Sequence, residues 1–300
     1  MEKVRKFYKN KRVLITGASG GIGRSMSYLF AKSGATLGIH YNENKDDAES
    51  LAFDINNSAG GEAICFQADL LSSDVVGLID NFVARTGGID ILINNAGAVF
   101  GFTEFLELDE VSWRDTQKLN VEAPFFLAQK AFMHMKKEGG GKIINIGSIS
   151  AKYGGSSRSL HYGAAKAALE SVTIGLARAG AQHNILVNVV RCGFIDTAFH
   201  EKLGALKNIE ERINLIPLKR AGKPEDVARM VLFLASESGD FITGEILEEE
   251  VKEIEDTSMI LPPETKTQVS GIRTIPNIQT PLPPTPGVNQ QLVAQATPNI

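Results

Sequence analysis

The sequence predicts an α/β protein built on a doubly wound parallel sheet. Short apolar runs rich in β-branched residues alternate with longer segments of helical period along most of the chain. These runs are apolar throughout, which is typical of parallel strands that helices cover on both faces. Ligands of such sheets bind beyond the carboxyl ends of the strands. Residues that follow each strand are therefore the first candidates for a functional site.

The individual elements follow from the same periodicity and from Gly-rich turns between the segments. The expected strands are, in chain order, Arg12–Thr16, Ala35–Tyr41, Glu62–Gln67, Ile89–Ile93, Lys142–Gly147 and Ile185–Val190. The expected helices are Ile22–Lys32, Asp46–Asn57, Asp74–Arg85, Val111–Lys137, His161–Gln182 and Pro224–Ala235.

Composition narrows the classes of function. A formal net charge of −4 argues against a nucleic-acid binder, and no apolar run approaches the ~20 residues that span a bilayer. Residues 1–11 are charged throughout, unlike a secretory signal. Two cysteines exclude a disulfide scaffold and fit a reducing compartment. We therefore expect a cytoplasmic protein that binds neither nucleic acid nor membrane.

Residues 1–247 and 248–300 differ in composition. Eight of the eleven prolines follow residue 247, whereas the last aromatic residue is Phe241. The tail carries seven acids against three bases. It begins with an acidic run and continues as Pro- and Thr-rich sequence. A segment without aromatics cannot bury enough apolar area to offset its ordering entropy. We expect one folded domain over 1–247 and a disordered tail over 248–300.

Two motifs follow expected strands. Residues 16–23 read TGASGGIG between the first strand and its helix, and residues 94–97 read NNAG after the fourth strand. A glycine-rich turn lets the backbone approach a ligand, and the helix N-terminus offers N–H groups to a pyrophosphate. Taken singly, the first motif could be a merely tight loop and the second an ordinary turn.

Tyr162 and Lys166 lie one turn apart on one face of an expected helix, and Ser148 follows the fifth strand. An ammonium about 5 Å away would favour the phenolate by about 3 kcal/mol at an effective dielectric of ~20. That lowering of the pKa suits general acid–base catalysis. A Tyr and a Lys that merely share a surface helix are the alternative. Tyr153 is a rival, which we set aside because Ser157 and not a lysine lies four residues beyond it.

Together these motifs resemble the short-chain dehydrogenase/reductase family. Residues 16–23 match its TGxxxGIG cofactor turn, residues 94–97 its NNAG motif, and residues 162–166 its YxxxK motif. Asn120 and Asp69 match two further family positions, and residues 216–244 match the C-terminal signature. The resemblance covers about residues 8–247. It is strongest to the 3-oxoacyl-acyl-carrier-protein reductase-like branch.

The resemblance implies a Rossmann-type sheet of strand order 3-2-1-4-5-6-7 and a nicotinamide cofactor. It implies that Tyr162 protonates the substrate carbonyl oxygen and that Ser148 hydrogen-bonds the same oxygen. Lys166 would lower the pKa of Tyr162 and bind the nicotinamide ribose, and Asn120 would hold a water in the proton relay. The implied cofactor contacts are Gly17, Ser19, Gly21, Ile22, Gly23, Asp69 at the adenine, Leu70, Asn95, Ala96, Gly97, Tyr162, Lys166, Ile195 and Thr197.

The end of the second strand bears on the choice of cofactor. An acid there would bond the ribose 2′-OH and repel a 2′-phosphate. Residues 39–42 read IHYN, so the first carboxylate comes only at Glu43, and Arg24 and Lys45 lie within sequence reach. We therefore expect NADP(H) to be favoured over NAD(H).

Two segments depart from the family pattern. Where Pro-Gly normally follows the sixth strand, this chain has Cys192-Gly193, and we expect an altered loop stiffness and no redox role for Cys192. The family's seventh strand ends in Val-Asp-Gly-Gly, whereas here Glu248–Glu250 follow Leu247. Because a buried unpaired carboxylate is costly, this strand should be truncated or stay solvated. In the family that strand lies at a subunit contact, so the altered strand end bears on whether the family's usual tetramer forms. A homo-oligomer is expected, either a dimer or a tetramer.

The expected activity is the NADP(H)-dependent reduction of a carbonyl to a secondary alcohol. The substrate would be a small molecule or a 3-oxoacyl thioester presented by acyl carrier protein. One alternative is an alcohol or sugar dehydrogenase that uses the same residues, and another is a cofactor-binding interaction protein whose tail recruits a partner. The five histidines show no metal-ligand spacing, so no metal is expected.

Overall fold

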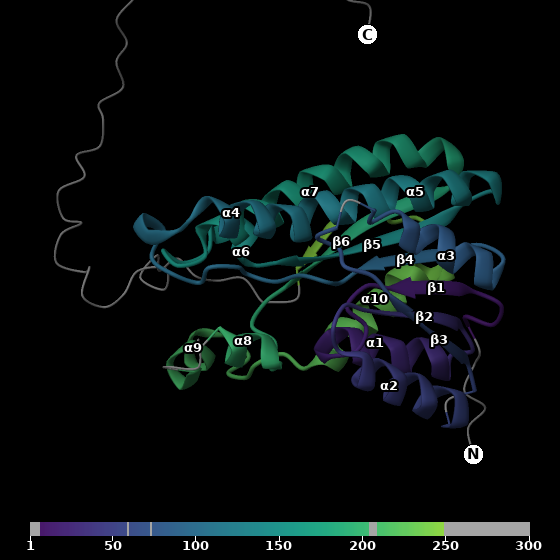
Figure 1. The fold of residues 1–300 in the computed structure, drawn as a ribbon, viewed down its shortest axis with the longest axis horizontal. Coiled ribbons are helices and arrows are strands. Elements are labelled where there is room, and N and C mark those ends of the chain that lie inside the picture. The colour runs from purple at the N-terminus through teal and green to yellow at the C-terminus, as the bar shows by residue number, and fades with distance from the viewer. Residues whose placement is uncertain (1–6, 59, 73, 204–208, 249–300) are drawn as a thin grey trace, which may run out of the picture. The chain divides into compact units, whose positions relative to one another are not determined.

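The computed structural model describes residues 7–58, 60–72, 74–203 and 209–248 (Figure 1). All of them belong to the first of two units, which covers residues 1–261. The expectation of a disordered tail therefore lies outside the described residues, apart from Glu248.

The described residues form one parallel sheet in the order β3-β2-β1-β4-β5-β6-β7. The strands are β1 (Arg12–Ile15), β2 (Thr36–Tyr41), β3 (Glu62–Gln67), β4 (Ile91–Asn94), β5 (Gly141–Ser148), β6 (Ile185–Cys192) and β7 (Ile246–Glu248). The predicted fold class and strand order are confirmed. The order reverses between β1 and β4, where sheets of this kind bind ligands beyond the carboxyl ends.

Helices cover both faces of the sheet (Figure 1). On one side lie α1 (Gly21–Lys32), α2 (Lys45–Ser58) and α10 (Pro224–Ala235), and on the other lie α3 (Gly77–Thr86), α4 (Glu110–Gln117), α5 (Ala123–Lys137) and α7 (Leu160–Gly180). Each layer has its own apolar core. Met26 and Phe30 belong to the first core, and Phe82 and Leu127 belong to the second. In the described ranges no helix is both long and apolar enough to cross a membrane.

The predicted helix over 111–137 is interrupted. Between α4 and α5 lies a π-helical turn, η2 (Lys118–Glu122). Pro124 gives the reason, because proline has no N–H and its ring clashes with the carbonyl four residues earlier, which belongs to Asn120. The turn therefore widens around Asn120, and π turns inside α-helices are frequent at functional sites.

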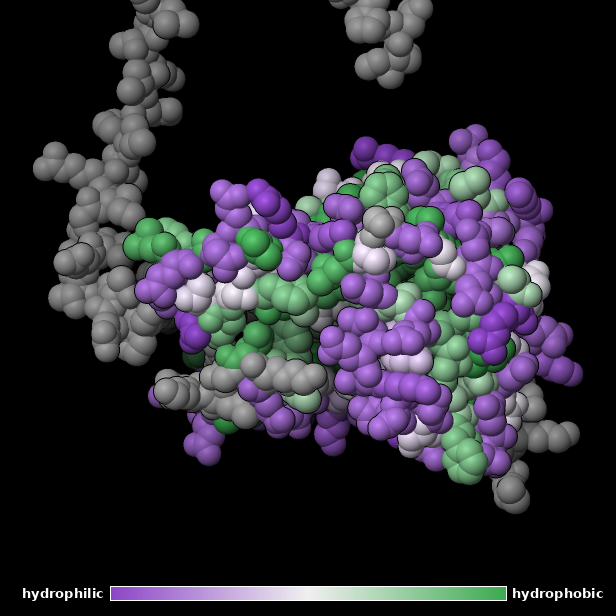
Figure 2. All heavy atoms as spheres, viewed as in Figure 1, coloured by the Kyte–Doolittle hydropathy of each residue, from purple (hydrophilic) through white to green (hydrophobic). Residues whose placement is uncertain are grey.

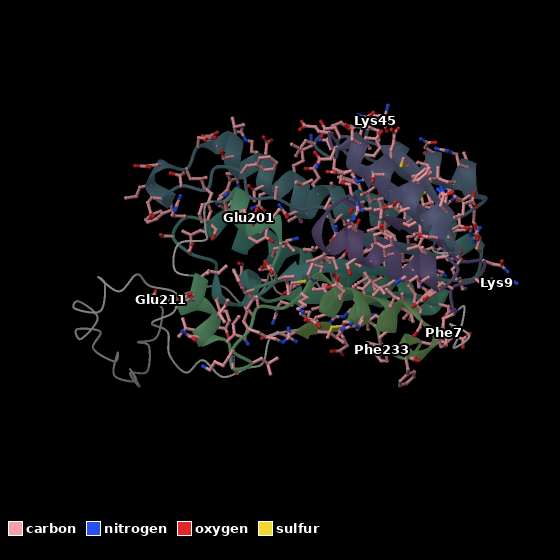
Figure 3. All side chains as sticks on the ribbon, turned by 90° about the horizontal axis from the view of Figure 1, so that it is seen from below. Phe7, Lys9, Lys45, Glu201, Glu211 and Phe233 are labelled. Carbon is pink, nitrogen blue, oxygen red and sulfur yellow. The ribbon has the colours of Figure 1, made fainter. Side chains whose placement is uncertain are left out.

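The structure has further short helical segments that were not predicted as separate elements. They are α6 (Ser150–Tyr153), α8 (Ala198–Lys202), α9 (Ile209–Leu215) and the 3₁₀ turns η1 (Phe105–Glu107), η3 (Ala181–His183) and η4 (Glu237–Gly239). Figure 3 shows Glu211, on α9, on the opposite side of the domain from Phe7 and Lys9. Helices α6 and α8 begin within a few residues of the carboxyl ends of β5 and β6, where a ligand would lie.

The expectation that the seventh strand ends before its first carboxylate or leaves that carboxylate in solvent is wrong for Glu248. Strand β7 runs parallel to β6 and includes Glu248, which pairs in register with Arg191. The Glu248 side chain is only 12% exposed, but it accepts hydrogen bonds from Arg191 Nη1 at 2.9 Å and from Lys152 Nζ at 3.1 Å. Burial raises the pKa of Glu248, yet the two cations outweigh burial and lower it. The carboxylate is tolerated in the strand because it is paired.

Candidate active site

The glycine-rich turn between β1 and α1 depends on positions that only glycine fills. Gly17 and Gly21 have positive φ angles of 60° and 49°. A Cβ at Gly23 would lie 2.3 Å from the Gly17 carbonyl oxygen, which is far inside van der Waals contact. The turn is therefore as tight as its motif predicts, and it ends at the N–H groups of the first turn of α1. Those groups have no partner within the helix and are suited to an anion.

The NNAG motif holds this turn in place. Asn95 Nδ2 donates to the carbonyl oxygens of Thr16 at 2.9 Å and Gly17 at 3.0 Å. The backbone N–H groups of Asn95 and Ala96 both donate to Thr16 Oγ1, at 2.9 and 3.0 Å. A Cβ at Gly17 would lie 3.1 Å from Ala96 Cα, so the two motifs touch. Asn95 and Ala96 thus shape the floor of the expected cofactor site.

The four predicted catalytic residues come together at the carboxyl edge of the sheet. Ser148 ends β5 and hydrogen-bonds Tyr162, which lies in the first turn of α7. Lys166 Nζ donates to the Ile146 carbonyl at 2.9 Å and lies 5.6 Å from the centre of the Tyr162 ring. Asn120 approaches from the π turn. Side chains from three elements therefore meet in one place.

Gly97 shows how closely they meet. A Cβ on Gly97 would lie 2.8 Å from Asn120 Oδ1 and 3.3 Å from Lys166 Nζ. Asn120 Nδ2 donates to the carbonyls of Ala98 at 2.8 Å and Thr116 at 2.9 Å. Its Oδ1 is buried and has no hydrogen-bond partner within the described part of the chain. A polar acceptor therefore points to a place where a water or hydroxyl group would satisfy it.

Burial dominates the pKa values of the pair. It raises the pKa of Tyr162 well above the ordinary value, although the Ser148 hydrogen bond lowers it. Burial also lowers the pKa of Lys166, to about 8. The predicted lowering of the Tyr162 pKa by Lys166 is therefore not the direction found, because the loss of hydration on burial is the largest effect. At neutral pH Tyr162 holds its proton and Lys166 is mainly charged.

The remaining predicted cofactor contacts surround the turn. Thr197 lies across Gly21, since a Cβ on that glycine would be 3.4 Å from Thr197 Cγ2. Ile195 is buried and bridges to Gly222. Asp69 Oδ1 accepts the N–H of Leu71 at 2.9 Å and stays exposed, whereas Leu70 is buried. Ser19 and Ile22 are half-buried.

The rival Tyr153 has a lysine neighbour that its sequence spacing did not predict. Lys152 Nζ lies 5.1 Å from the centre of the Tyr153 ring. That ammonium, however, donates to both oxygens of Glu248, at 3.1 and 3.4 Å. Tyr153 therefore shares its lysine with a carboxylate, unlike Tyr162.

Three residues near the site were not expected from spacing. His40 contacts the glycine-rich turn through its ring, and Phe199 of α8 lies with its ring centre 6.0 Å from that of Tyr162. Cys192 is buried and close enough to act electrostatically on both Tyr162 and Lys166. Figure 2 shows apolar residues gathered in a hollow between the surface over α4 and α6 and that over α8 and α9. His40, Cys192 and Phe199 come near the site only in the folded chain, so no local sequence motif could identify them.

The arrangement fits a dinucleotide. The turn and the first N–H groups of α1 would hold the pyrophosphate, and Gly97 leaves room beside Asn120 and Lys166 for a nicotinamide ribose. Two cations lie in the first turns of α1 and α2, the helices that follow β1 and β2. Arg24 Nη2 is 3.5 Å from Asp54 Oδ2, and Lys45 Nζ is 3.6 Å from Glu49 Oε1 (Figure 3 labels Lys45). Over the described residues, no group of three His, Cys, Asp or Glu side chains could hold a metal ion.

Comparison with known proteins agrees with this geometry. Residues 17–249 match the family model described as enoyl-(acyl carrier protein) reductase. The chain is 34% identical over 240 residues to the 3-oxoacyl-(acyl-carrier-protein) reductase FabG of Thermotoga maritima, which covers 80% of this chain and 96% of the relative. It is 35% identical over 240 residues to FabG of Staphylococcus epidermidis, covering 79% and 96%. A solved structure of a short-chain alcohol dehydrogenase from Sinorhizobium meliloti superposes with a TM-score of 0.75 at 31% identity, covering 81% of this chain and 96% of that one.

Proposed function

This chain belongs to the short-chain dehydrogenase/reductase family and is an NAD(P)-dependent oxidoreductase, and from this premise we propose that it reduces 3-oxoacyl thioesters to 3-hydroxyacyl thioesters with NADPH. Acyl carrier protein would present the substrate, as the names of the relatives indicate for those proteins. The observation that carries the proposal is the Ser148–Tyr162 hydrogen bond beside Lys166, at the same edge of the sheet as the glycine-rich turn and two strands away from β1.

The reaction adds a hydride to the carbonyl carbon and a proton to the carbonyl oxygen. When bound, the nicotinamide cofactor supplies the hydride. Tyr162 donates the proton from its hydroxyl, and Ser148 hydrogen-bonds the same oxygen and holds it at the Tyr162 hydroxyl. Lys166 binds the ribose and stabilises the phenolate that remains. Asn120 Oδ1 holds the water through which Tyr162 is reprotonated.

The burial of Tyr162 suits the role of general acid in the reduction. Because burial raises its pKa, the phenol keeps its proton at neutral pH. A protonated phenol is the form that a general acid needs, and the alkoxide formed by hydride addition is basic enough to accept the proton.

The preference for NADPH rests on the end of β2. No carboxylate stands at residues 39–42, where one would repel a 2′-phosphate, and Asn42 is exposed there. Arg24 and Lys45 each have an acidic neighbour at 3.5–3.6 Å, a distance at which an exposed pair is weak. Either cation could turn to a phosphate at little cost. Comparable kcat/KM values for NADH and NADPH would show this part of the proposal to be wrong.

The function is tested with a panel of substrates, and the reaction is monitored by the absorbance of the cofactor. With acetoacetyl thioesters and NADPH we expect steady oxidation of the cofactor. Tyr162→Phe should lower kcat by about 10²–10⁴-fold, because it removes only the hydroxyl. Tyr153→Phe is the matched control and should keep activity. A Tyr162→Phe variant with near wild-type kcat would remove Tyr162 from the mechanism.

The panel also separates the alternatives. A protein that ignores thioesters but oxidises secondary alcohols or sugars with NADP⁺ or NAD⁺ would be the alcohol or sugar dehydrogenase. A protein that binds cofactor but turns over no member of the panel would revive the interaction-protein hypothesis, although the family membership favours an enzyme.

We expect the enzyme to form a homo-oligomer. Large apolar side chains are exposed on α4 and α5, where Val111, Trp113, Phe126 and Met133 are 38–63% exposed. Light scattering coupled to size exclusion tests this expectation. A monomer at micromolar concentration would refute it.

A further inference from the structure

His40 lies at the carboxyl end of β2 and is buried, with 2% of its surface exposed. It is paired in register with Phe66 of β3. Its position lies beside the glycine-rich turn that follows β1, on the side away from the NNAG motif. A buried imidazole at this place needs partners for both ring nitrogens.

Both nitrogens have such partners. The Gly17 N–H donates to Nδ1 at 3.0 Å, and Nε2 lies 3.1 Å from the Ala68 carbonyl oxygen. Since Gly17 can only donate, Nδ1 must accept and the ring hydrogen must sit on Nε2, which then donates to Ala68. The geometry therefore selects one neutral tautomer. The next N–H of the turn, that of Ala18, donates to the His40 carbonyl at 2.9 Å.

His40 thus holds the turn from one side while Asn95 holds it from the other. Asn95 Nδ2 binds the Gly17 carbonyl at 3.0 Å, and His40 binds the Gly17 N–H. Gly17 has a positive φ of 60°, a conformation that glycine adopts readily and that other residues rarely adopt. The two N–H groups satisfied by His40 belong to Gly17 and Ala18. The N–H groups that follow, at the start of α1, are thereby directed to the ligand.

The same ring reaches the adenine end of the expected site. Its Nε2 partner, Ala68, directly precedes Asp69, and the Ala68 N–H donates to the Tyr41 carbonyl at 3.1 Å. One imidazole therefore connects the pyrophosphate turn after β1 with the segment after β3. These two segments contact opposite halves of the adenosine diphosphate moiety in the proposed binding mode.

We propose that the His40 side chain is a positioning residue for cofactor binding, which sets the glycine-rich turn through Gly17 and the adenine-binding segment through Ala68. It does not touch the reacting atoms, so its loss affects cofactor affinity far more than kcat at saturating cofactor. This inference rests on the proposed cofactor site but not on the identity of the substrate.

Three variants separate the two contacts. His40→Asn keeps an acceptor at the position of Nδ1 for Gly17, His40→Gln keeps a donor near the position of Nε2 for Ala68, and His40→Leu removes both. Phe82→Leu is the matched control for loss of packing, because Phe82 is fully buried on the same side of the sheet and its ring packs on that of Phe66, the register neighbour of His40. Titration of each protein with NADPH and with NADH, followed by cofactor fluorescence, gives Kd without any turnover. Thermal melts without cofactor record the structural cost.

We expect His40→Leu to raise Kd by about five- to tenfold or more, as for the loss of hydrogen bonds that position a binding turn. His40→Asn should stay within about threefold of wild type, because it keeps the Gly17 contact, and Phe82→Leu should not change Kd. If His40→Leu fails to fold, the comparison of His40→Asn with His40→Gln decides, and tighter binding by His40→Asn is expected.

The proposal is overturned if His40→Leu binds cofactor within twofold of wild type. It is also overturned if His40→Gln, which loses the Gly17 contact, binds cofactor as tightly as wild type, or if Phe82→Leu loses affinity in proportion to the drop in its melting temperature. Absence of activity toward thioesters would count against the proposed substrate only, because Kd is measured without one.

Discussion

Replacing Arg191 by Met should destabilise the protein far more than a surface substitution does. The Arg191 guanidinium binds Glu170 of α7 through two parallel contacts of 2.8 Å and binds Glu248 of β7 at 2.9 Å. The Arg191, Glu170 and Glu248 side chains are 14%, 10% and 12% exposed. Methionine keeps the length of the side chain but removes the charge, so Glu170 loses its bidentate partner in a poorly hydrated place.

The size of the effect follows from that burial. Removing one partner of a buried ion pair costs about 3–5 kcal/mol. Residual exposure and the Lys152 contact to Glu248 reduce the expected loss to about 2–3 kcal/mol. A second substitution, Glu170→Gln, removes the stranded charge and should restore part of that loss. The variant Glu248→Gln should cost less, because Arg191 keeps Glu170.

Urea unfolding followed by circular dichroism measures these free energies, at one protein concentration because an oligomer's stability depends on concentration. The wild type, both single variants at 191 and 170, and the double variant form one cycle. The reasoning fails if Arg191→Met lies within 1 kcal/mol of wild type, roughly the range of exposed ion pairs. It also fails if the double variant is as unstable as the sum of the two single variants.

Three further outcomes are expected. Gly23→Ala should weaken NADPH binding at least about tenfold in titrations, since its Cβ would lie 2.3 Å from the Gly17 carbonyl. Burial lowers the pKa of His40 to about 4. The unfolded chain, with a His pKa of about 6.5, therefore binds a proton more readily, and the free energy of unfolding falls as the pH falls from about 6.5 toward 4. At pH 5 the wild type should have lost about 2 kcal/mol more of this free energy than His40→Gln in urea melts. Asn145→Ala should lower the free energy of unfolding by about 1–3 kcal/mol in the same melts, because buried Asn94 Nδ2 loses its 2.8 Å acceptor. An unchanged NADPH affinity of Gly23→Ala, the same pH dependence for wild type and His40→Gln, or an unchanged urea midpoint of Asn145→Ala would contradict the corresponding prediction.

Much of the site could be predicted because its determinants are local. The spacing of Tyr162 and Lys166, the glycines of the turn and the position of Ser148 after a strand are all properties of short segments. The structure brings these residues together as expected. The pKa of Tyr162 lies above its ordinary value and not below it as predicted, because its direction depends on burial by segments that are distant in the sequence.

The π turn at Asn120 depends both on the local sequence and on packing in the folded chain. Its cause, Pro124, is visible in the sequence, and a proline inside a helical period signals an interruption. Whether the helix would kink, end or widen depends on packing, and the buried contacts of Asn120 with Ala98 and Thr116 favour the widened turn.

The sequence by itself determined the fold class, the order of the elements and the motifs of the cofactor turn. These features depend on hydrophobic periodicity and on backbone conformations that few residues adopt, and both act within a few neighbouring residues. Tertiary structure alone decided that Glu248 can stand in β7 and that His40 binds the turn. Arg191 meets Glu248 across 57 positions, and His40 meets Gly17 across 23. The stability of a buried charge or imidazole depends on such partners, and only the folded chain supplies them.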